Sequence, residues 1–118
     1  MAKNIVYPLD NNTLELPVAT GTVAGDPVMV GQIPGVALTD RDANGNAVVQ
    51  IGSFVATLSV KGENNAGAVA VAAGDILYHE AAATPKINKD NVAGIRYGYA
   101  LEAVASNATA TIKVLVGY

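Results

Sequence analysis

The chain has 118 residues, of which 51% are hydrophobic but only 5% are aromatic and 14% are charged, and its formal net charge is −3. An ordinary soluble domain carries roughly 25% charged residues, so this composition indicates a surface that a partner partly covers, unless alanine alone inflates the hydrophobic count. The seven basic residues are scattered, which argues against binding to nucleic acid. Without cysteine, the chain has no disulfide, no thiolate metal site and no cysteine nucleophile.

Nothing in the sequence has the pattern of a segment that enters a membrane. No stretch approaches the ~18 apolar residues of a membrane helix, and the first residues lack the apolar core of a signal peptide. We therefore expect no membrane partner. The length fits one domain, for which we expect residues 11–118, preceded by an extended arm at residues 1–10. The arm residues expected to contact a partner are Lys3, Asn4, Tyr7 and Pro8.

Short alternating segments between turn residues predict β-strands along the whole chain, and no segment has a convincing 3.6-residue period. Residues 13–16 form the first such segment. Pro27 and Pro34 place the next strand near a sheet edge or at strand ends, because proline cannot donate a ladder hydrogen bond. Asn44-Gly45 then predicts a hairpin with a type I′ turn, in which both central residues need a positive φ.

The run from Ala47 to Val60 changes phase, which predicts a break in the strand. Apolar residues alternate up to Ile51, and from Phe54 onward they alternate with the opposite parity. A strand cannot switch faces without an extra residue, and Gly52-Ser53 stands at the switch. We therefore expect a bulge or bend there, and passage of the chain from one sheet layer to another.

Two phrases occur twice in the sequence. Glycine tolerates positive φ and aspartate bonds the backbone of its own turn, so each pair of phrases predicts a turn, a strand and a return strand. Only two copies of unequal length occur, which indicates two related hairpins within one domain and not a solenoid. The predicted fold is all-β: a compact single-domain β-barrel or β-sandwich of short antiparallel strands, with at most one short helical turn. The phrases are Ala24-Gly25-Asp26, repeated as Ala73-Gly74-Asp75, and Gly35-Val36-Ala37-Leu38, repeated as Gly98-Tyr99-Ala100-Leu101.

The residues that could bind a metal form no complete site. Asp40 to Asn46 matches the first half of a calcium loop, but Ile51 stands where the bidentate glutamate belongs, so a hairpin turn explains the same letters. His79 is the only histidine, and without a second histidine or a cysteine it does not indicate zinc. We expect it at a strand end, on the surface or at an interface.

No catalytic constellation is recognisable either. No serine stands in a Gly-x-Ser-x-Gly elbow, and no Gly-Lys-Ser/Thr phosphate loop occurs. Two of the four acids that could form a catalytic pair belong to the Gly-Asp turns, where a structural role accounts for them. We therefore expect no enzymatic activity, no cofactor and no metal. The four acids are Asp26, Asp75, Glu80 and Glu102.

Tyr97 and Tyr99 are two residues apart, so we expect them on one face of a strand at residues 95–101. Such a pair is most often half-buried core or solvent-facing surface. Because protein interfaces favour tyrosine, a subunit interface is the sharper alternative.

The order of the strand and turn phrases resembles the small capsid cement proteins, also called decoration or head-stabilising proteins, of tailed bacteriophages and prophages. This resemblance implies a β-domain that binds the outer surface of the assembled head as a homo-oligomer, with a trimer favoured over a dimer. Its partner would be the major capsid protein, and it would be synthesised in the bacterial host cytoplasm. The phrases that carry the resemblance are Met1 to Asn4, Leu14-x-Leu16, Val28-x-Val30-Gly31, Gly35 to Ala37, Ala73-Gly74-Asp75-x-Leu77-Tyr78, Gly98-x-Ala100-Leu101-Glu102-Ala103 and Val114-Leu115.

We therefore expect a structural capsid protein that bridges neighbouring capsid subunits by many weak contacts. The alternative from another class is a receptor- or carbohydrate-binding β-module of a phage head or tail fibre.

Overall fold

A computed structural model describes residues 12–117, which form eleven β-strands and no helix. The all-β prediction is confirmed. Since these residues contain no helix, they contain no helical segment able to cross a membrane. The strands are β1 (Thr13–Pro17), β2 (Pro27–Val30), β3 (Ile33–Ala37), β4 (Asn46–Gln50), β5 (Phe54–Lys61), β6 (Glu63–Asn64), β7 (Gly67–Ala68), β8 (Ile76–His79), β9 (Ile87–Asn88), β10 (Ile95–Ala100) and β11 (Thr109–Val116).

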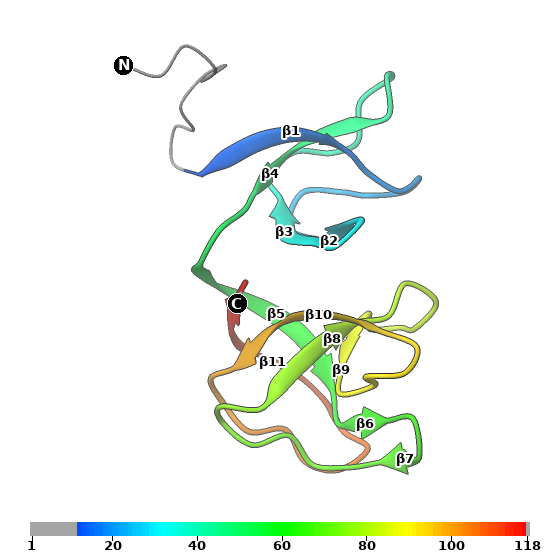
Figure 1. Cartoon of the computed structure of the whole chain (residues 1–118), viewed down its shortest axis with the longest axis vertical. Coiled ribbons are helices and arrows are strands. Elements are labelled where there is room, and N and C mark those ends of the chain that lie inside the picture. Colours follow the sequence, from blue (N-terminus) through cyan, green and yellow to red (C-terminus); the bar gives the residue numbers. More distant parts are fainter. Residues whose placement is uncertain (1–11, 118) are drawn as a thin grey trace.

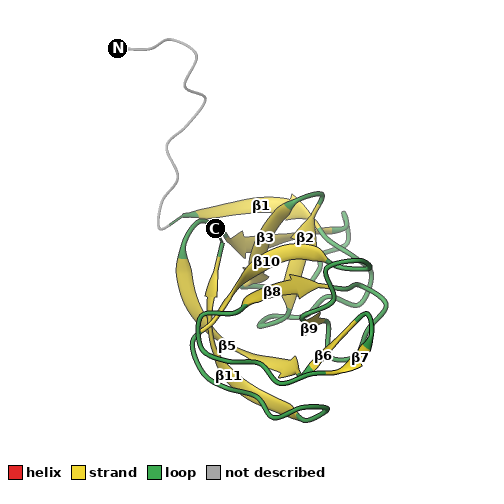
Figure 2. Cartoon of the chain, turned by 60° about the horizontal axis from the view of Figure 1, so that its bottom comes forward, coloured by secondary structure: helices red, strands yellow, loops and turns green. Residues whose placement is uncertain are grey.

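Two β-structures pack together in one compact globule (Figures 1 and 2). The first four strands form a curled sheet in the order β1-β4-β3-β2, in the upper part of Figure 1. Below it, a closed barrel runs β10-β11-β5-β9-β8, and β6 and β7 form a small hairpin at its end. β2 is an edge strand of the curled sheet, as Pro27 predicts.

The chain passes from the sheet to the barrel between β4 and β5, where the sequence changes phase. Gly52 has a φ of +83° and lies in a bend. Before the bend, Val49 is buried in the sheet, and after it Leu58 and Val60 are buried in the barrel. The predicted bend and change of layer are confirmed.

The barrel repeats the strand arrangement of the sheet. We call β1 to β4 the first unit, and β5, β8, β10 and β11 the second unit. The order β1-β4-β3-β2 of the first unit corresponds to β5-β11-β10-β8 in the second. The registers correspond as well: Val28 pairs with Gly35 as Leu77 pairs with Gly98. The internal repeat is therefore larger than the two hairpins that the sequence predicts, since each copy includes four strands.

The repeated Gly-Asp phrases fold in the same way in both units. Gly25 and Gly74 each have a φ of +94°. Gly25 N donates to Ala37 O at 2.7 Å, and Gly74 N donates to Ala100 O at 2.7 Å. In both turns the aspartate carboxylate accepts the N–H three residues before it, at 3.0 Å in the first unit and 2.8 Å in the second. These phrases build corners from which a strand departs.

The predicted hairpin between β3 and β4 is confirmed, but the prediction of a type I′ turn is wrong. Only Gly45 has a positive φ, at +86°, while Asn44 does not. The carboxylate of Asp42 accepts the N–H groups of Asn44 and Asn46, each at 2.9 Å. The Asp42 side chain stabilises a turn in which only Gly45 has a positive φ, so a second residue with positive φ is not needed.

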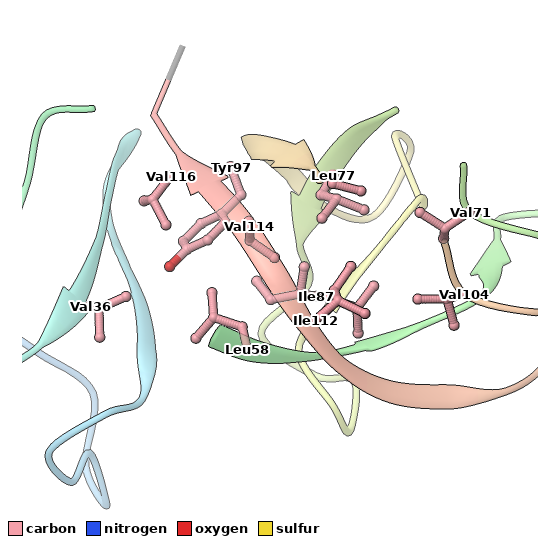
Figure 3. Packing of buried hydrophobic residues seen from close by; sticks show 12 residues of the cluster. Val36, Leu58, Val71, Leu77, Ile87, Tyr97, Val104, Ile112, Val114 and Val116 are labelled. Atoms are coloured by element: carbon pink, nitrogen blue, oxygen red, sulfur yellow. The ribbon is translucent and has the colours of Figure 1, made fainter. Parts of the chain in front are cut away.

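The main core lies inside the barrel and reaches the first unit (Figure 3). Leu77, Ile87 and Val114 are fully buried there, and Val36 of β3 belongs to the same cluster. The first unit has a smaller cluster of its own, formed by Val28, Ala37 and Val49 with Leu16, Val18 and Ile51 packed against it. The two units thus share one large core, and the first unit adds a small one.

Candidate binding surfaces

The predicted arm contacts cannot be placed on the fold. The described residues begin at Asn12, directly before β1. The predicted contacts outside them are Lys3, Asn4, Tyr7 and Pro8.

The structure separates the two tyrosines that the sequence places on one face. A β-bulge lies in β10, where the pairing with β8 shifts between Arg96 and Gly98. Because the extra residue switches the parity of the strand, Tyr97 points into the core and Tyr99 points outward. The same-face prediction is therefore wrong.

Tyr97 joins the two units from the inside. It is 0% exposed, and its hydroxyl donates to Gly35 O of β3 at 2.6 Å. Figure 3 shows this hydroxyl pointing out of the barrel toward the first unit. Burial raises the pKa of Tyr97. Its side chain lies inside its own chain and offers no surface to a second subunit.

Tyr99 is half-buried and is paired with Arg96. The Arg96 guanidinium lies over the Tyr99 ring, 5.4 Å from its centroid, and also donates a hydrogen bond to the Tyr99 hydroxyl. Arginine and tyrosine are both enriched at protein interfaces. The subunit interface predicted at Tyr99 stays a prediction, and no pattern in the sequence indicated Arg96 as its neighbour.

His79 stands at the end of β8, as predicted, but it is buried between the units and not on the surface. Its side chain is 8% exposed, because β2 of the first unit packs against β8. Burial lowers the pKa of His79, while the backbone of Pro27 partly opposes this effect. Its ring lies 6.0 Å from the ring of Tyr97, centroid to centroid.

The acids singled out in the sequence each bind nearby structural groups. Glu80 accepts the side-chain N–H of Asn88 at 3.0 Å, and Glu102 accepts the N–H of Lys113 at 2.7 Å. Asp40 accepts the N–H of Ala24 at 2.9 Å. Residues 12–117 contain no cluster of three or more acidic or histidine side chains that could hold a metal ion.

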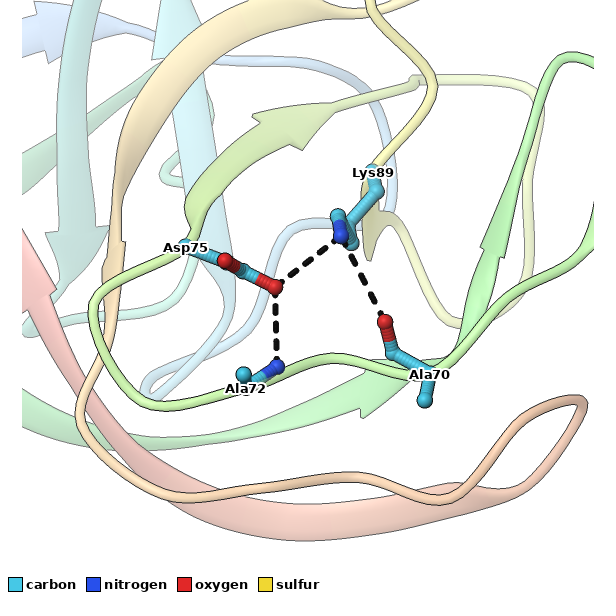
Figure 4. A network of polar contacts seen from close by, with 4 residues as sticks. All are labelled: Ala70, Ala72, Asp75 and Lys89. Carbon is cyan, nitrogen blue, oxygen red and sulfur yellow. Dashed lines mark hydrogen bonds and ion pairs between the residues drawn. The ribbon is translucent and has the colours of Figure 1, made fainter.

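Asp75 has an additional partner in Lys89 (Figure 4). Lys89 Nζ lies 2.9 Å from Asp75 Oδ2 and 3.4 Å from Ala70 O. The N–H of Ala72 and the Lys89 ammonium together hold the pKa of Asp75 below its usual value. This ion pair connects the end of β9 to the Gly-Asp turn of the second unit.

Exposed apolar side chains occur at matching places in the two units. Leu38 is 47% exposed and its counterpart Leu101 is 42% exposed. Ile33 and Ile95, which stand at the starts of β3 and β10, are 43% and 42% exposed. Single exposed apolar residues are common, but their recurrence at equivalent positions gives each unit a similar apolar rim.

The fold and these surfaces define an all-β structural domain of two related units. The acidic side chains described above form hydrogen bonds or ion pairs within turns and between strands. The chain belongs to the phage cement protein family, whose sequence model matches residues 9–116. No curated protein and no solved structure matches the chain significantly. The resemblance found in the strand and turn phrases is thus confirmed, and the protein is a virion-associated cement protein of a phage capsid.

The sequence contained one signal that would have revealed the larger repeat. Ile51-Gly52 follows β4 as Val116-Gly117 closes β11, and both glycines have positive φ, at +83° and +97°. An alignment of these pairs, together with the Gly-Asp phrases, relates the last strand of each unit, β4 and β11. The Arg96–Tyr99 pair had no such signal, because it depends on the bulge.

Proposed function

We propose that this protein binds the outer surface of the assembled phage head and bridges neighbouring capsid subunits, without catalysing a reaction. The observation that carries the proposal is the family match over residues 9–116. The charge-poor composition and the matched apolar rims support it, since both suit a surface that a capsid lattice covers. Several weak contacts on one lattice stabilise a shell through multivalency.

In this proposal the arm and the Arg96–Tyr99 pair have different partners. The arm residues reach the major capsid protein, and Tyr99 lies at the interface of a homo-oligomer, with a trimer favoured. The arm residues are Lys3, Asn4, Tyr7 and Pro8.

Binding to heads that lack the protein tests the proposal. Purified protein is mixed with expanded heads, and the bound fraction is measured after sedimentation. We expect saturable binding, weaker binding after deletion of residues 1–10, and density on the outer surface by electron microscopy. Absence of the chain from the parent virion would overturn the proposal, and equal binding without the arm would overturn the role of the arm.

The oligomer is tested separately by light scattering. The Tyr99→Ala variant is expected to shift the molar mass toward the monomer, while Val92→Ala, at a side chain that is 74% exposed, leaves it unchanged. If Tyr99→Ala leaves the oligomer intact, Tyr99 is not at the subunit interface.

A further inference from the structure

The first unit is open at the place where the second unit is closed. In the barrel, β9 lies between β5 and β8: Ile87 pairs with Val60 in parallel and with His79 in antiparallel orientation. Among the described residues, no strand lies between β1 and β2, the counterparts of β5 and β8. We call this place the open position. Its borders are Val18, Met29 and Val30, which correspond to Val60, Tyr78 and His79.

Side chains beside the open position are less covered than their counterparts in the barrel. Leu58 is 4% exposed and Val60 is 0% exposed, with Ile87 of β9 in the same cluster. The counterparts Leu16 and Val18 are only half-buried. The first unit therefore has an apolar face that lacks the equivalent of Ile87, and covering it would remove further apolar surface from water.

Asp26, beside the open position, has no ion-pair partner among the described residues. In the second unit, Lys89 follows β9 and pairs with Asp75. Asp26 is the counterpart of Asp75, and neither of the two ion pairs among residues 12–117 includes it. Lys86 is close by, but its ammonium donates to Ala81 O at 2.8 Å.

A cavity lies next to the open position, between the first unit and the barrel. Its volume is about 310 Å³, and Asp26, Met29 and residues 19–22 line one side of it. His79, Ala81 and Lys86 of the barrel line it as well. Pro17 and Pro27 lack N–H groups and limit the pairing at both edges, so an added strand would be short, as the two-residue β9 is.

We propose that the open position binds a short extended segment of the major capsid protein. A β-branched apolar residue of this segment packs on Leu16 and Val18, and a lysine or arginine two residues later pairs with Asp26, as Ile87 and Lys89 do in the second unit. Strand addition of this kind combines backbone hydrogen bonds with specific side-chain contacts. The identity of the partner rests on the proposed function, whereas the chemistry of the site does not.

The arm of the same chain does not fit the open position. A strand there runs parallel to β1, as β9 runs parallel to β5. Parallel neighbours need a crossover connection of about a dozen residues or more, and residues 3–9 lie closer than that to Thr13. The limit on connection length does not apply to the arm of a second copy. The test must therefore distinguish that arm from a segment of the major capsid protein.

A peptide taken from the chain itself can be used as the probe for the open position. A labelled synthetic peptide with the sequence of residues 86–91 contains the Ile87 and Lys89 pattern, and its binding to the whole protein is followed by fluorescence anisotropy and NMR. We expect saturable binding that weakens about tenfold when the peptide carries Ile87→Asp or Lys89→Glu. The protein variant Asp26→Asn is expected to weaken binding of the parent peptide but not of a Lys89→Gln peptide. No binding, or equal binding of all peptides, would overturn the site.

Binding to heads then identifies the occupant. The Asp26→Lys variant is expected to bind about tenfold less tightly than the parent protein, while Glu15→Lys, on an exposed residue of β1, is expected to bind normally. Circular dichroism checks that both variants are folded. If the peptide binds but Asp26→Lys decorates heads normally, the capsid segment is not the occupant. An oligomer that Asp26→Lys dissociates would then indicate the arm of a second copy. If the parent protein itself does not bind heads, the proposed function fails, and the peptide result still decides on the site.

Discussion

The two units of this protein have the same strand order, registers and Gly-Asp corners, yet they differ in how completely they are closed. The difference comes from one connection. Only residues 31–32 separate β2 from β3, whereas residues 80–94 separate β8 from β10 and contain β9. The longer connection supplies Ile87 and Lys89, which fill the core and pair with Asp75. A repeated framework can therefore give one stable closed half and one half whose edges remain available.

This division agrees with the proposed role on a capsid. The barrel is closed within the chain, because β9 joins β5 to β8. The first unit has edges at β1 and β2, and an exposed edge readily accepts another strand. We infer that the barrel gives the fold most of its stability and that the first unit takes part in binding.

The largest expected loss of stability comes from the glycines where β3 and β10 closely approach the following strand. A Cβ at Gly98 would stand 2.1 Å from Leu115 O, and one at Gly35 would stand 2.6 Å from Gln50 O. We expect Gly98→Ala to lower the free energy of unfolding by about 4 kcal/mol or more, and Gly35→Ala by somewhat less because the open sheet can adjust. Urea denaturation measures both, with Val92→Ala as the control. A larger loss of stability in Gly35→Ala than in Gly98→Ala would contradict the expectation that the open sheet adjusts more easily than the barrel.

Truncation of equivalent valines compares the two cores directly. Val114 is 0% exposed in the barrel, and its counterpart Val49 is 1% exposed in the first unit. We expect Val114→Ala to cost about 3 kcal/mol and Val49→Ala about 2 kcal/mol, because half-buried neighbours can relax around the smaller cavity. Equal losses by denaturation would show that the small cluster is packed as rigidly as the barrel.

The sequence predicted those features that depend on local chemistry. The two Gly-Asp corners, the bend at Gly52-Ser53 and the inward face of β5 follow from glycine, aspartate and residue parity alone. The bulge at Tyr97 was not predictable in this way, because it depends on pairing with β8. It reversed the position of one tyrosine and created the pair of Arg96 with Tyr99. The open position could not be predicted from the sequence either, because it is recognised only by comparison with the place that β9 fills in the barrel.

The hydroxyl of Tyr97 is expected to contribute to the connection between the units. Tyr97→Phe removes the hydrogen bond to Gly35 O and should lower the free energy of unfolding by about 1–2 kcal/mol. Hydrogen exchange should also show lower protection of β3 than of β11. Tyr99→Phe is the matched control, because it removes a hydroxyl that bonds to Arg96 of the same strand and not to the first unit, so it should leave the protection of β3 unchanged. Equal effects of the two variants would mean that this bond does not connect the units.

The smallest expected effect concerns the two corner aspartates. The pKa of Asp75 is lowered in the folded protein, so its carboxylate stabilises the fold above the usual carboxyl pKa, and this contribution is lost as the pH falls through the lowered value. We expect Asp75→Asn to cost about 0.5–1 kcal/mol at neutral pH, since the ion pair is partly exposed. The cost should disappear in acid.

Asp26→Asn retains an oxygen that can accept the N–H of Val23, and Asp26 has no ion pair to lose among the described residues. Its cost at neutral pH should therefore be smaller than that of Asp75→Asn. Urea denaturation of both variants and the parent protein, at neutral pH and in acid, makes the comparison. An equal cost for the two variants would show that Lys89 adds nothing at the closed corner, and the reason to expect a basic residue beside Asp26 would then be lost.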